Sequence, residues 1–242
     1  MNKKIWGPVA VLMLLAVLLG GAFLLLRQPQ TRGGEEARDE TARVTSAPEP
    51  TPTLEPTPEP TPTPKPEDGD LVVVQDWIPT IFVELRYATP NNFTGRVIYD
   101  FTQAQLRYGT VKKLARVQEA LLREGYSLKI WDAYRPVHAQ FRLWEVCPNS
   151  AYVANPNTGY SSHSRGNTVD LTLVRPDGTE IEMPSDFDEF SAIADRNYGD
   201  VSQAARDNVM RLENAMQAEG FVGYSAEWWH FSDGTFYDVV TD

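Results

Sequence analysis

The stretch SSHSRGNTVDLTLV at residues 161–174 passes from a polar loop into a strand. Its first half is rich in serine and carries His163 and Gly166, which is typical of a loop. Residues 167–174 are β-prone and carry Asp170, which predicts a strand. A histidine and a carboxylate therefore lie close to the point where this loop leads into the predicted strand.

The elements on both sides of this strand follow from hydrophobic spacing. One helix is predicted from Thr110, as its N-cap, to Gly125, and another over residues 202–219, where Gly220 ends the pattern. A shorter helix should open at Arg135-Pro136 and run to about Val146. The remaining expectations are strands over residues 71–74, 81–85, 126–134 and 221–231, a turn over 91–95, and a turn at 175–178 into a short partner strand over 179–183. Because these elements show no regular βαβ order, we expect an α+β domain with helices packed on a mainly antiparallel sheet.

The first 70 residues differ in composition from the rest of the chain. Residues 5–26 carry no charge, and at about 1.5 Å per residue they span the roughly 30 Å core of a bilayer. The alternative is a cleaved signal peptide, whose apolar part usually has only about 7–15 residues. Residues 48–66 contain nine prolines among 19 residues, mostly interleaved with Thr and Glu. This composition predicts an extended, solvated spacer.

We therefore expect a cytoplasmic tip and transmembrane signal anchor over residues 1–28, a disordered linker over 29–70, and one domain over 71–242. Arginines after the apolar segment outnumber the lysines before it, which by the positive-inside rule alone would place the domain in the cytoplasm. A membrane-tethered spacer, however, makes most sense if it reaches into a cell wall. We expect a single-pass membrane protein with an extracytoplasmic domain.

Charge and cysteine content exclude other functions. The chain has 22 Lys and Arg against 33 Asp and Glu, a net charge of −11, and no basic stripe, so nucleic-acid binding is not expected. Cys147 is the single cysteine, which rules out an intramolecular disulfide and a multi-cysteine zinc site. A metal centre would have to use His, Asp or Glu. Of the three histidines, we interpret His138 as a surface residue of the short helix.

Two imidazoles and one carboxylate meet the requirement of an open catalytic zinc site. His163, Asp170 and His230 would supply three ligands, with water in the fourth position. Each histidine alone is more often an ordinary core or surface side chain, so the hypothesis depends on the set. Glu227, in the sequence EWWH at 227–230, would be free to act as general base. Because positions i and i+3 of a regular strand face opposite sides, we expect a bend or bulge at Glu227.

A third stretch, WDAYRP at 131–136, places Arg135 at a predicted strand-to-helix junction. A surface cation is the commoner fate of such an arginine. If it faces the metal, its guanidinium can stabilise the oxyanion of a tetrahedral intermediate.

Together these motifs resemble the zinc D-alanyl-D-alanine dipeptidases of vancomycin-resistance clusters. The matching stretches are DAYRP at 132–136, SSHSRGNTVDLTL at 161–173, EWWHF at 227–231 and YATPNNFTG at 87–95. The resemblance covers residue 71 to the C-terminus. It implies one Zn²⁺ held by His163, Asp170 and His230, with Glu227 as general base and Arg135 as the arginine that stabilises the transition state.

The resemblance also implies substrate-binding residues. These are Ser161 and Tyr87 near the dipeptide termini, and an aspartate that pairs with the free ammonium, which we place at Asp188 although Asp186 and Glu189 are neighbours. A stem peptide of the cell wall presents an amide in place of that ammonium, so an aspartate there would favour the free dipeptide. The implied fold is the small α+β zinc peptidase fold shared with D,D-carboxypeptidases and the hedgehog signalling domain.

The expected function is hydrolysis of the D-Ala-D-Ala dipeptide by a bacterial zinc metallopeptidase, and two alternatives stay open. Residues 147–160 form a short stretch that can leave the cleft open to longer peptides, as in a D,D- or L,D-carboxypeptidase or endopeptidase acting on peptidoglycan. A domain outside the membrane would meet mature wall or released fragments. The second alternative is a non-catalytic module that binds a wall ligand.

Overall fold

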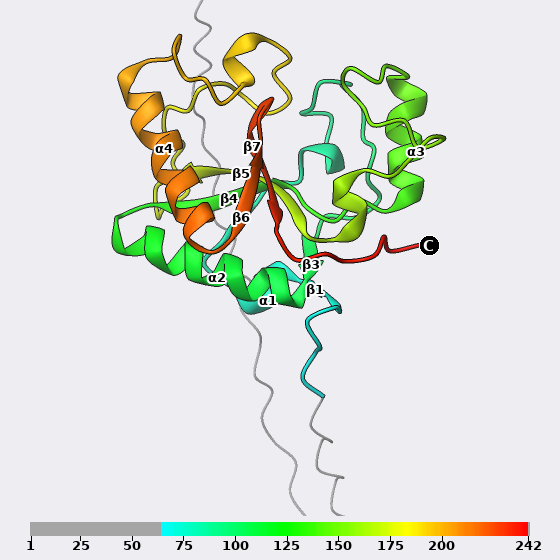
Figure 1. Cartoon of the computed structure of the whole chain (residues 1–242), viewed down its shortest axis with the longest axis horizontal. Helices are drawn as coiled ribbons and strands as arrows, with labels where there is room; N and C mark the ends of the chain where they lie inside the picture. Colours follow the sequence, from blue (N-terminus) through cyan, green and yellow to red (C-terminus); the bar gives the residue numbers. More distant parts are fainter. Residues whose placement is uncertain (1–63, 242) are drawn as a thin grey trace, which may run out of the picture. The chain divides into compact units, whose positions relative to one another are not determined.

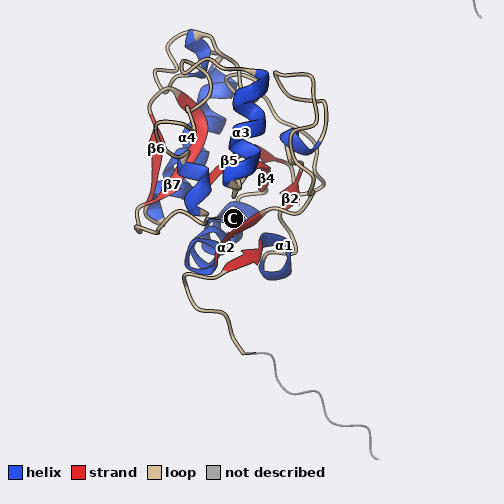
Figure 2. Ribbon diagram, turned by 90° about the vertical axis from the view of Figure 1, so that its right-hand side faces the viewer, coloured by secondary structure: helices blue, strands red, loops and turns tan. Residues whose placement is uncertain are grey.

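Five strands in the order β2-β4-β5-β7-β6 form the central sheet of the computed structural model, which describes residues 64–241 (Figures 1 and 2). β2 pairs with β4 in parallel, and the three other pairings are antiparallel. The sheet strands are β2 (Phe82–Val83), β4 (Ser127–Asp132), β5 (Thr168–Val174), β6 (Phe221–Tyr224) and β7 (Glu227–Asp233). The predicted α+β class with a mainly antiparallel sheet is confirmed.

Two long helices cover one face of this sheet. α2 (Tyr108–Arg123) packs on β4, and α4 (Gln203–Ala218) packs on β5 and β6. Each helix buries an apolar stripe, because its aliphatic residues recur at helical spacing. The stripes consist of Leu114, Val117 and Leu121 in α2, and of Val209, Leu212 and Met216 in α4.

Another helix, α3 (Val137–Val146), lies on the other side of the sheet from α4 (Figures 1 and 2). β4 and β5 are buried along their whole length. Smaller elements complete the fold: α1 (Val74–Trp77), the antiparallel pair β1 (Leu71–Val73) and β3 (Gln105–Arg107), and the 3₁₀ helices η1 (Arg86–Ala88), η2 (Ser162–Arg165) and η3 (Ala192–Ala194).

The predicted helices are present, and one predicted cap is wrong. Ser202 caps α4, and its Oγ accepts a hydrogen bond of 3.0 Å from the backbone N–H of Ala205. Thr110, however, is not an N-cap, because α2 begins at Tyr108 directly after β3. The Thr110 hydroxyl instead donates to Asp233 Oδ2 at 2.9 Å. A tertiary hydrogen bond thus replaces the expected local one.

Two strand predictions are corrected. Residues 179–183 form no strand in the described part of the chain, where Glu180 makes only an isolated bridge to Val174. Residues 221–231 are not one strand, because the chain turns at Ser225 and Ala226 and divides them into the hairpin of β6 and β7.

The predicted membrane segment at residues 5–26 lies outside the described residues, and so do residues 48–63 of the proline-rich stretch at 48–66. Among residues 64–241, no helix is long and apolar enough to cross a bilayer. The division into segments 1–28, 29–70 and 71–242 stays a prediction.

Candidate metal centre and active site

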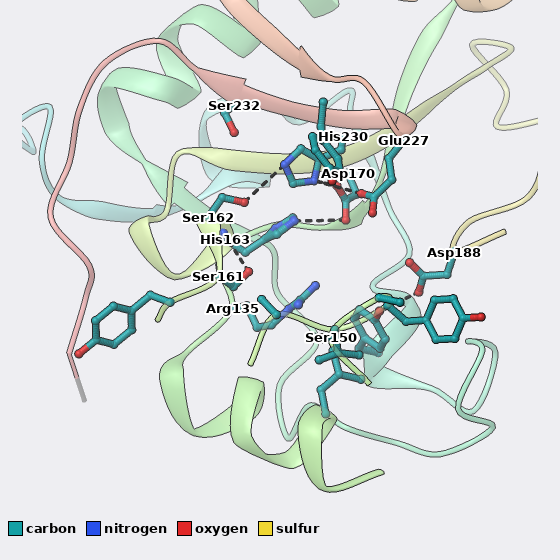
Figure 3. Close-up of a pocket in the computed structure, with 18 of the residues that line it drawn as sticks. Arg135, Ser150, Ser161, Ser162, His163, Asp170, Asp188, Glu227, His230 and Ser232 are labelled. Carbon is teal, nitrogen blue, oxygen red and sulfur yellow. Dashed lines mark hydrogen bonds and ion pairs between the residues drawn. The ribbon is translucent and has the colours of Figure 1, made fainter. Parts of the chain in front are cut away.

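The three predicted metal ligands come together from three elements. His163 lies on η2, Asp170 on β5 and His230 on β7, where Asp170 and His230 face each other across paired strands. His163 Nε2 lies 3.3 Å from Asp170 Oδ2, and His230 Nδ1 lies 3.0 Å from Asp170 Oδ1 (Figure 3). One ligand atom from each residue lies within 4.8 Å of the others. This spacing suits a single metal ion.

The loop before β5 aims His163 at this cluster. Ser161 Oγ accepts a hydrogen bond from the His163 backbone N–H at 3.3 Å and so caps η2. Gly166 ends η2 with φ of 74°, in the left-handed region that glycine adopts without a steric penalty. The serine and glycine of the loop thus fix the turn that precedes the strand.

The hydrogen bonds of the two imidazoles fit a metal. His163 Nδ1 lies 2.8 Å from the Ala133 carbonyl, which can only accept, so Nδ1 carries the proton and Nε2 keeps its lone pair for the cluster. His230 Nε2 lies 3.4 Å from Ser162 Oγ, and Nδ1 faces Asp170. Asp170 Oδ1 is buried and, apart from its 3.0 Å contact with His230 Nδ1, has no hydrogen-bond partner among the residues that the structure describes. A cation between these atoms would satisfy it.

The charges of the cluster depend on one another. Burial favours the neutral form of Asp170, but His163 and His230 outweigh it and hold the pKa of Asp170 well below its usual range. Burial also opposes charge on His163, yet Asp170 and Asp132 raise the pKa of that imidazole. The site therefore keeps an ionised carboxylate, a group that binds divalent cations, between the two imidazoles.

Glu227 reaches the same side of β7 as His230 through the expected bulge. Gly223 of β6 is paired with Phe231, but the next residue, Tyr224, is paired with Glu227, so β7 carries extra residues at this point. Glu227 Oε2 lies 3.5 Å from His230 Nδ1. Burial raises the pKa of Glu227, and the negative charge of Asp170 adds to the effect.

Arg135 is buried at the cleft wall and is not a surface cation. Its Nη2 lies 2.5 Å from Asp132 Oδ2, and its Nη1 donates to Gln140 Oε1 at 2.8 Å. Its Nε donates to Tyr99 Oη at 3.0 Å, while Tyr99 donates to Asp132 Oδ1 at 2.7 Å. Sequence reasoning missed these three partners. Only Asp132 could have been found from the sequence, because it lies three residues before Arg135 in the same DAYRP motif.

The proposed substrate residues lie in the same cleft. Tyr87 Oη donates to Asp188 Oδ2 at 2.7 Å, and Ser161 is a buried wall residue. Desolvation raises the pKa of Asp188 to about 8. Asp186 is held elsewhere, because its Oδ1 accepts from Arg86 Nη2 at 3.0 Å. Of these two aspartates, Asp188 therefore faces the cleft.

The cleft has a volume of about 560 Å³ and is open to solvent. Residues 150–154 form part of its wall, and the exposed rings of Tyr152, Tyr160 and Tyr224 stand at its edge. His138 is exposed on α3 and lies outside the cleft lining, as expected. A His, Asp and His cluster beside a carboxylate and an arginine gives the cleft the groups of a metal-dependent hydrolase.

The chain belongs to the peptidase M15 family, because the family model described as D-ala-D-ala dipeptidase matches residues 67–238. The D-alanyl-D-alanine dipeptidase of Escherichia coli (strain K12) is 39% identical over 162 residues, which cover 67% of this chain and 82% of that protein. The D-alanyl-D-alanine dipeptidase of Enterococcus faecium is 34% identical over 168 residues, covering 61% and 83%. A solved structure, VanYB in complex with D-Alanine-D-Alanine, has 14% identity and a TM-score of 0.37, covering 55% of this chain and 73% of that one.

Proposed function

We propose that this chain is a zinc metallopeptidase that hydrolyses the D-Ala-D-Ala dipeptide. The observation that carries the proposal is the convergence of His163, Asp170 and His230 beside Glu227, in a chain whose relatives are D-alanyl-D-alanine dipeptidases. The complete set of ligands and base argues against a module that only binds a ligand.

The three ligand residues would hold one Zn²⁺ in each catalytic domain. When bound, zinc supplies a Lewis acid that polarises a carbonyl and lowers the pKa of water. Glu227 takes a proton from the attacking water and passes it to the amine that leaves when the peptide bond breaks. Its raised pKa makes Glu227 a stronger base than an exposed glutamate. Arg135 donates to the oxygen of the scissile carbonyl as negative charge develops there.

Asp188 and Tyr87 would bind the substrate ammonium, and Ser161 would bind near the other terminus. In its ionised form Asp188 pairs with a free ammonium, whereas the amide of a longer peptide would leave the carboxylate without a cation. This pairing supports a dipeptide as the substrate. The open rim of the cleft favours the alternative, a carboxypeptidase or endopeptidase acting on peptidoglycan stem peptides.

A two-substrate assay separates these functions. The full chain is incubated with free D-Ala-D-Ala and with a stem pentapeptide, each with added zinc and with a chelator. We expect zinc-dependent release of D-alanine from the dipeptide alone. Cleavage of only the pentapeptide would reject the dipeptidase in favour of a carboxypeptidase, and binding without turnover would indicate a binding module.

We also propose that residues 5–26 anchor the chain in a bacterial membrane and that the domain lies outside the cytoplasm. We further propose that the domain has the fold shared with D,D-carboxypeptidases and the hedgehog signalling domain. The uncharged length of that segment and the proline-rich stretch after it support this placement. Protease added to intact spheroplasts should remove the domain. Protection until the membrane is permeabilised would place it in the cytoplasm.

A further inference from the structure

Arg196 does not line the cleft, but it binds the hairpin that carries Glu227 and His230. Its Nη2 donates to the His230 carbonyl at 2.8 Å, and its Nε donates to the Tyr224 carbonyl at 2.8 Å. Its backbone N–H donates to the Ser225 carbonyl at 3.1 Å. One residue therefore holds three carbonyls of the hairpin, including that of a proposed metal ligand.

These contacts lie where the pairing of β6 and β7 is irregular. The register changes between Gly223 and Tyr224, and the residues from Glu227 to His230 form the bulge of β7. A bulge interrupts the ladder, so its peptide groups need other partners. The planar guanidinium has donors in a fixed fork and can bind a carbonyl on each side of the irregular pairing.

The guanidinium is itself held in place. Glu213 of α4 forms an ion pair with Arg196 Nη1, and the same carboxylate oxygen accepts from Tyr198 Oη at 2.6 Å. The guanidinium lies 4.4 Å from the centroid of the Phe231 ring. α4 thus fixes Arg196, and Arg196 in turn fixes β7.

Gly223 leaves the space that this arrangement needs. A Cβ at Gly223 would overlap the guanidinium of Arg196. The backbone of Gly223 is not in the left-handed region, so an alanine there can keep the strand conformation, and the nearest atoms to its Cβ would be those of the Arg196 guanidinium. The pair offers a way to displace Arg196 without removing its charge.

We infer that Arg196 is a positioning residue for the metal centre. Arg196 binds a carbonyl of β6 and a carbonyl of β7 at the bulge. It thereby keeps Glu227 and His230 on one face of β7, with Glu227 Oε2 3.5 Å from His230 Nδ1. This inference rests on the proposed zinc peptidase function. It assigns a role in metal binding and turnover to Arg196 and to Glu213 of α4, neither of which lines the cleft.

Arg196→Gln tests the inference in the full chain. Zinc affinity of the metal-free protein is measured by competition with a chelator, and kcat and KM are measured for D-Ala-D-Ala. We expect zinc affinity to fall about 10–100-fold, as for other residues that orient metal ligands. We also expect kcat to fall and KM to change little, because Tyr87 and Asp188 lie on other segments. Arg196→Lys, which keeps the charge but loses the fork, should be intermediate.

Arg206→Gln is the matched control. Arg206 donates to the carbonyls of Tyr198 and Gly199, at 3.0 and 3.2 Å, and to none of the hairpin. It should keep the zinc affinity of the wild type. Gly223→Ala should reproduce the loss in part, and adding it to Arg196→Gln should cost nothing further, because the two residues act through one contact.

The outcomes are distinct. A folded Arg196→Gln chain with wild-type zinc affinity and kcat, even if its Tm is lower, overturns the inference and leaves Arg196 a purely structural role. If Arg196→Gln does not fold, wild-type zinc affinity in both Arg196→Lys and Gly223→Ala overturns it equally. A wild-type chain that binds no zinc overturns the proposed function together with this inference.

Discussion

Arg135 has its charge matched by Asp132 in the wall of the cleft, and Asp170 contacts two imidazoles a few ångströms away. Each of these buried groups keeps its charge because a neighbouring side chain pairs with it. Removing one side chain therefore changes both the chemistry and the stability of the site. Variants at this scale must be chosen so that the two effects can be separated.

Glu227→Ala is expected to keep zinc and to lose turnover. The substitution removes the proposed base but none of the three proposed ligands, and general-base catalysis contributes about 10²–10⁴-fold. Metal analysis and kcat for D-Ala-D-Ala measure the two properties on one sample. Glu145→Ala, at an exposed position of α3, is the control. An empty metal site in Glu227→Ala would instead identify Glu227 as a ligand or as a structural residue.

Arg135→Ala should lower kcat by about 10²–10³ if the guanidinium stabilises the oxyanion. It also leaves Asp132 buried without its cation, which costs about 3–5 kcal/mol of stability. The Tm of the variant is measured alongside kcat, and the assay is run well below it. Unchanged kcat in the folded variant would remove Arg135 from the mechanism.

Asp188→Asn is expected to change how stability depends on pH. Desolvation raises the pKa of Asp188 to about 8 in the folded chain, whereas an unfolded aspartate titrates at about 3.9. Between these values the folded chain binds one proton more, so its free energy of unfolding falls as pH rises, by up to about 1.4 kcal/mol per unit. Asparagine does not titrate in this range, so the variant lacks this contribution to the pH dependence.

The measurement is chemical unfolding of the metal-free chain at pH 5 and pH 7, with chelator present. Relative to the wild type, Asp188→Asn should become more stable over this interval. If the free energy of unfolding changes equally with pH in the two proteins, the pKa of Asp188 is not raised in the folded chain.

At the scale of elements, periodicity predicted the helices better than it predicted the hairpin. The i, i+3 spacing of Glu227 and His230 indicated a bulge, and the bulge is present. The turn at Ser225 and Ala226 was missed because neither residue is a Gly, Asn or Asp of the kind that marks tight hairpins. The cap at Thr110 failed for another reason, since its hydroxyl is used by Asp233 from the far end of the chain.

Ser202→Ala should destabilise the domain by about 1 kcal/mol. Its Oγ accepts from the Ala205 N–H at 3.0 Å, and loss of an N-cap side chain typically costs about 0.5–2 kcal/mol. Urea unfolding measures the difference. Ser202→Thr, which keeps the acceptor and also the hydroxyl that donates to Glu182 Oε1 at 2.6 Å, should recover most of it. Equal stability of wild type and Ser202→Ala would show that water satisfies the helix end as well.

At the scale of the whole molecule, the site exists because β5 and β7 are neighbours in the sheet. Residue types and motif spacing led to His163, Asp170 and His230, and the structure brings them together. The strand order and the register of Asp170 against His230 were beyond sequence reasoning, because they depend on packing between distant segments. The same applies to Arg196, whose partners lie on α4 and on the hairpin.

Because the proposed ligands lie on η2, β5 and β7, a zinc ion would connect three elements and bind only the folded chain. Zinc at 100 times its Kd should then raise the free energy of unfolding by about 2.7 kcal/mol. For a domain of this size the Tm should rise by roughly 5–10 °C, and a chelator should reverse the rise.

Asp170→Asn is the control for this thermal experiment, because it keeps the size of the side chain and removes the carboxylate between the two imidazoles. The variant should show little change of Tm with zinc. Magnesium should not replace zinc in the wild type, since Mg²⁺ prefers oxygen ligands and two of the three donors are nitrogens. An equal rise in wild type and Asp170→Asn would mean that zinc binds elsewhere on the chain, and the convergence of the three elements would then need another explanation.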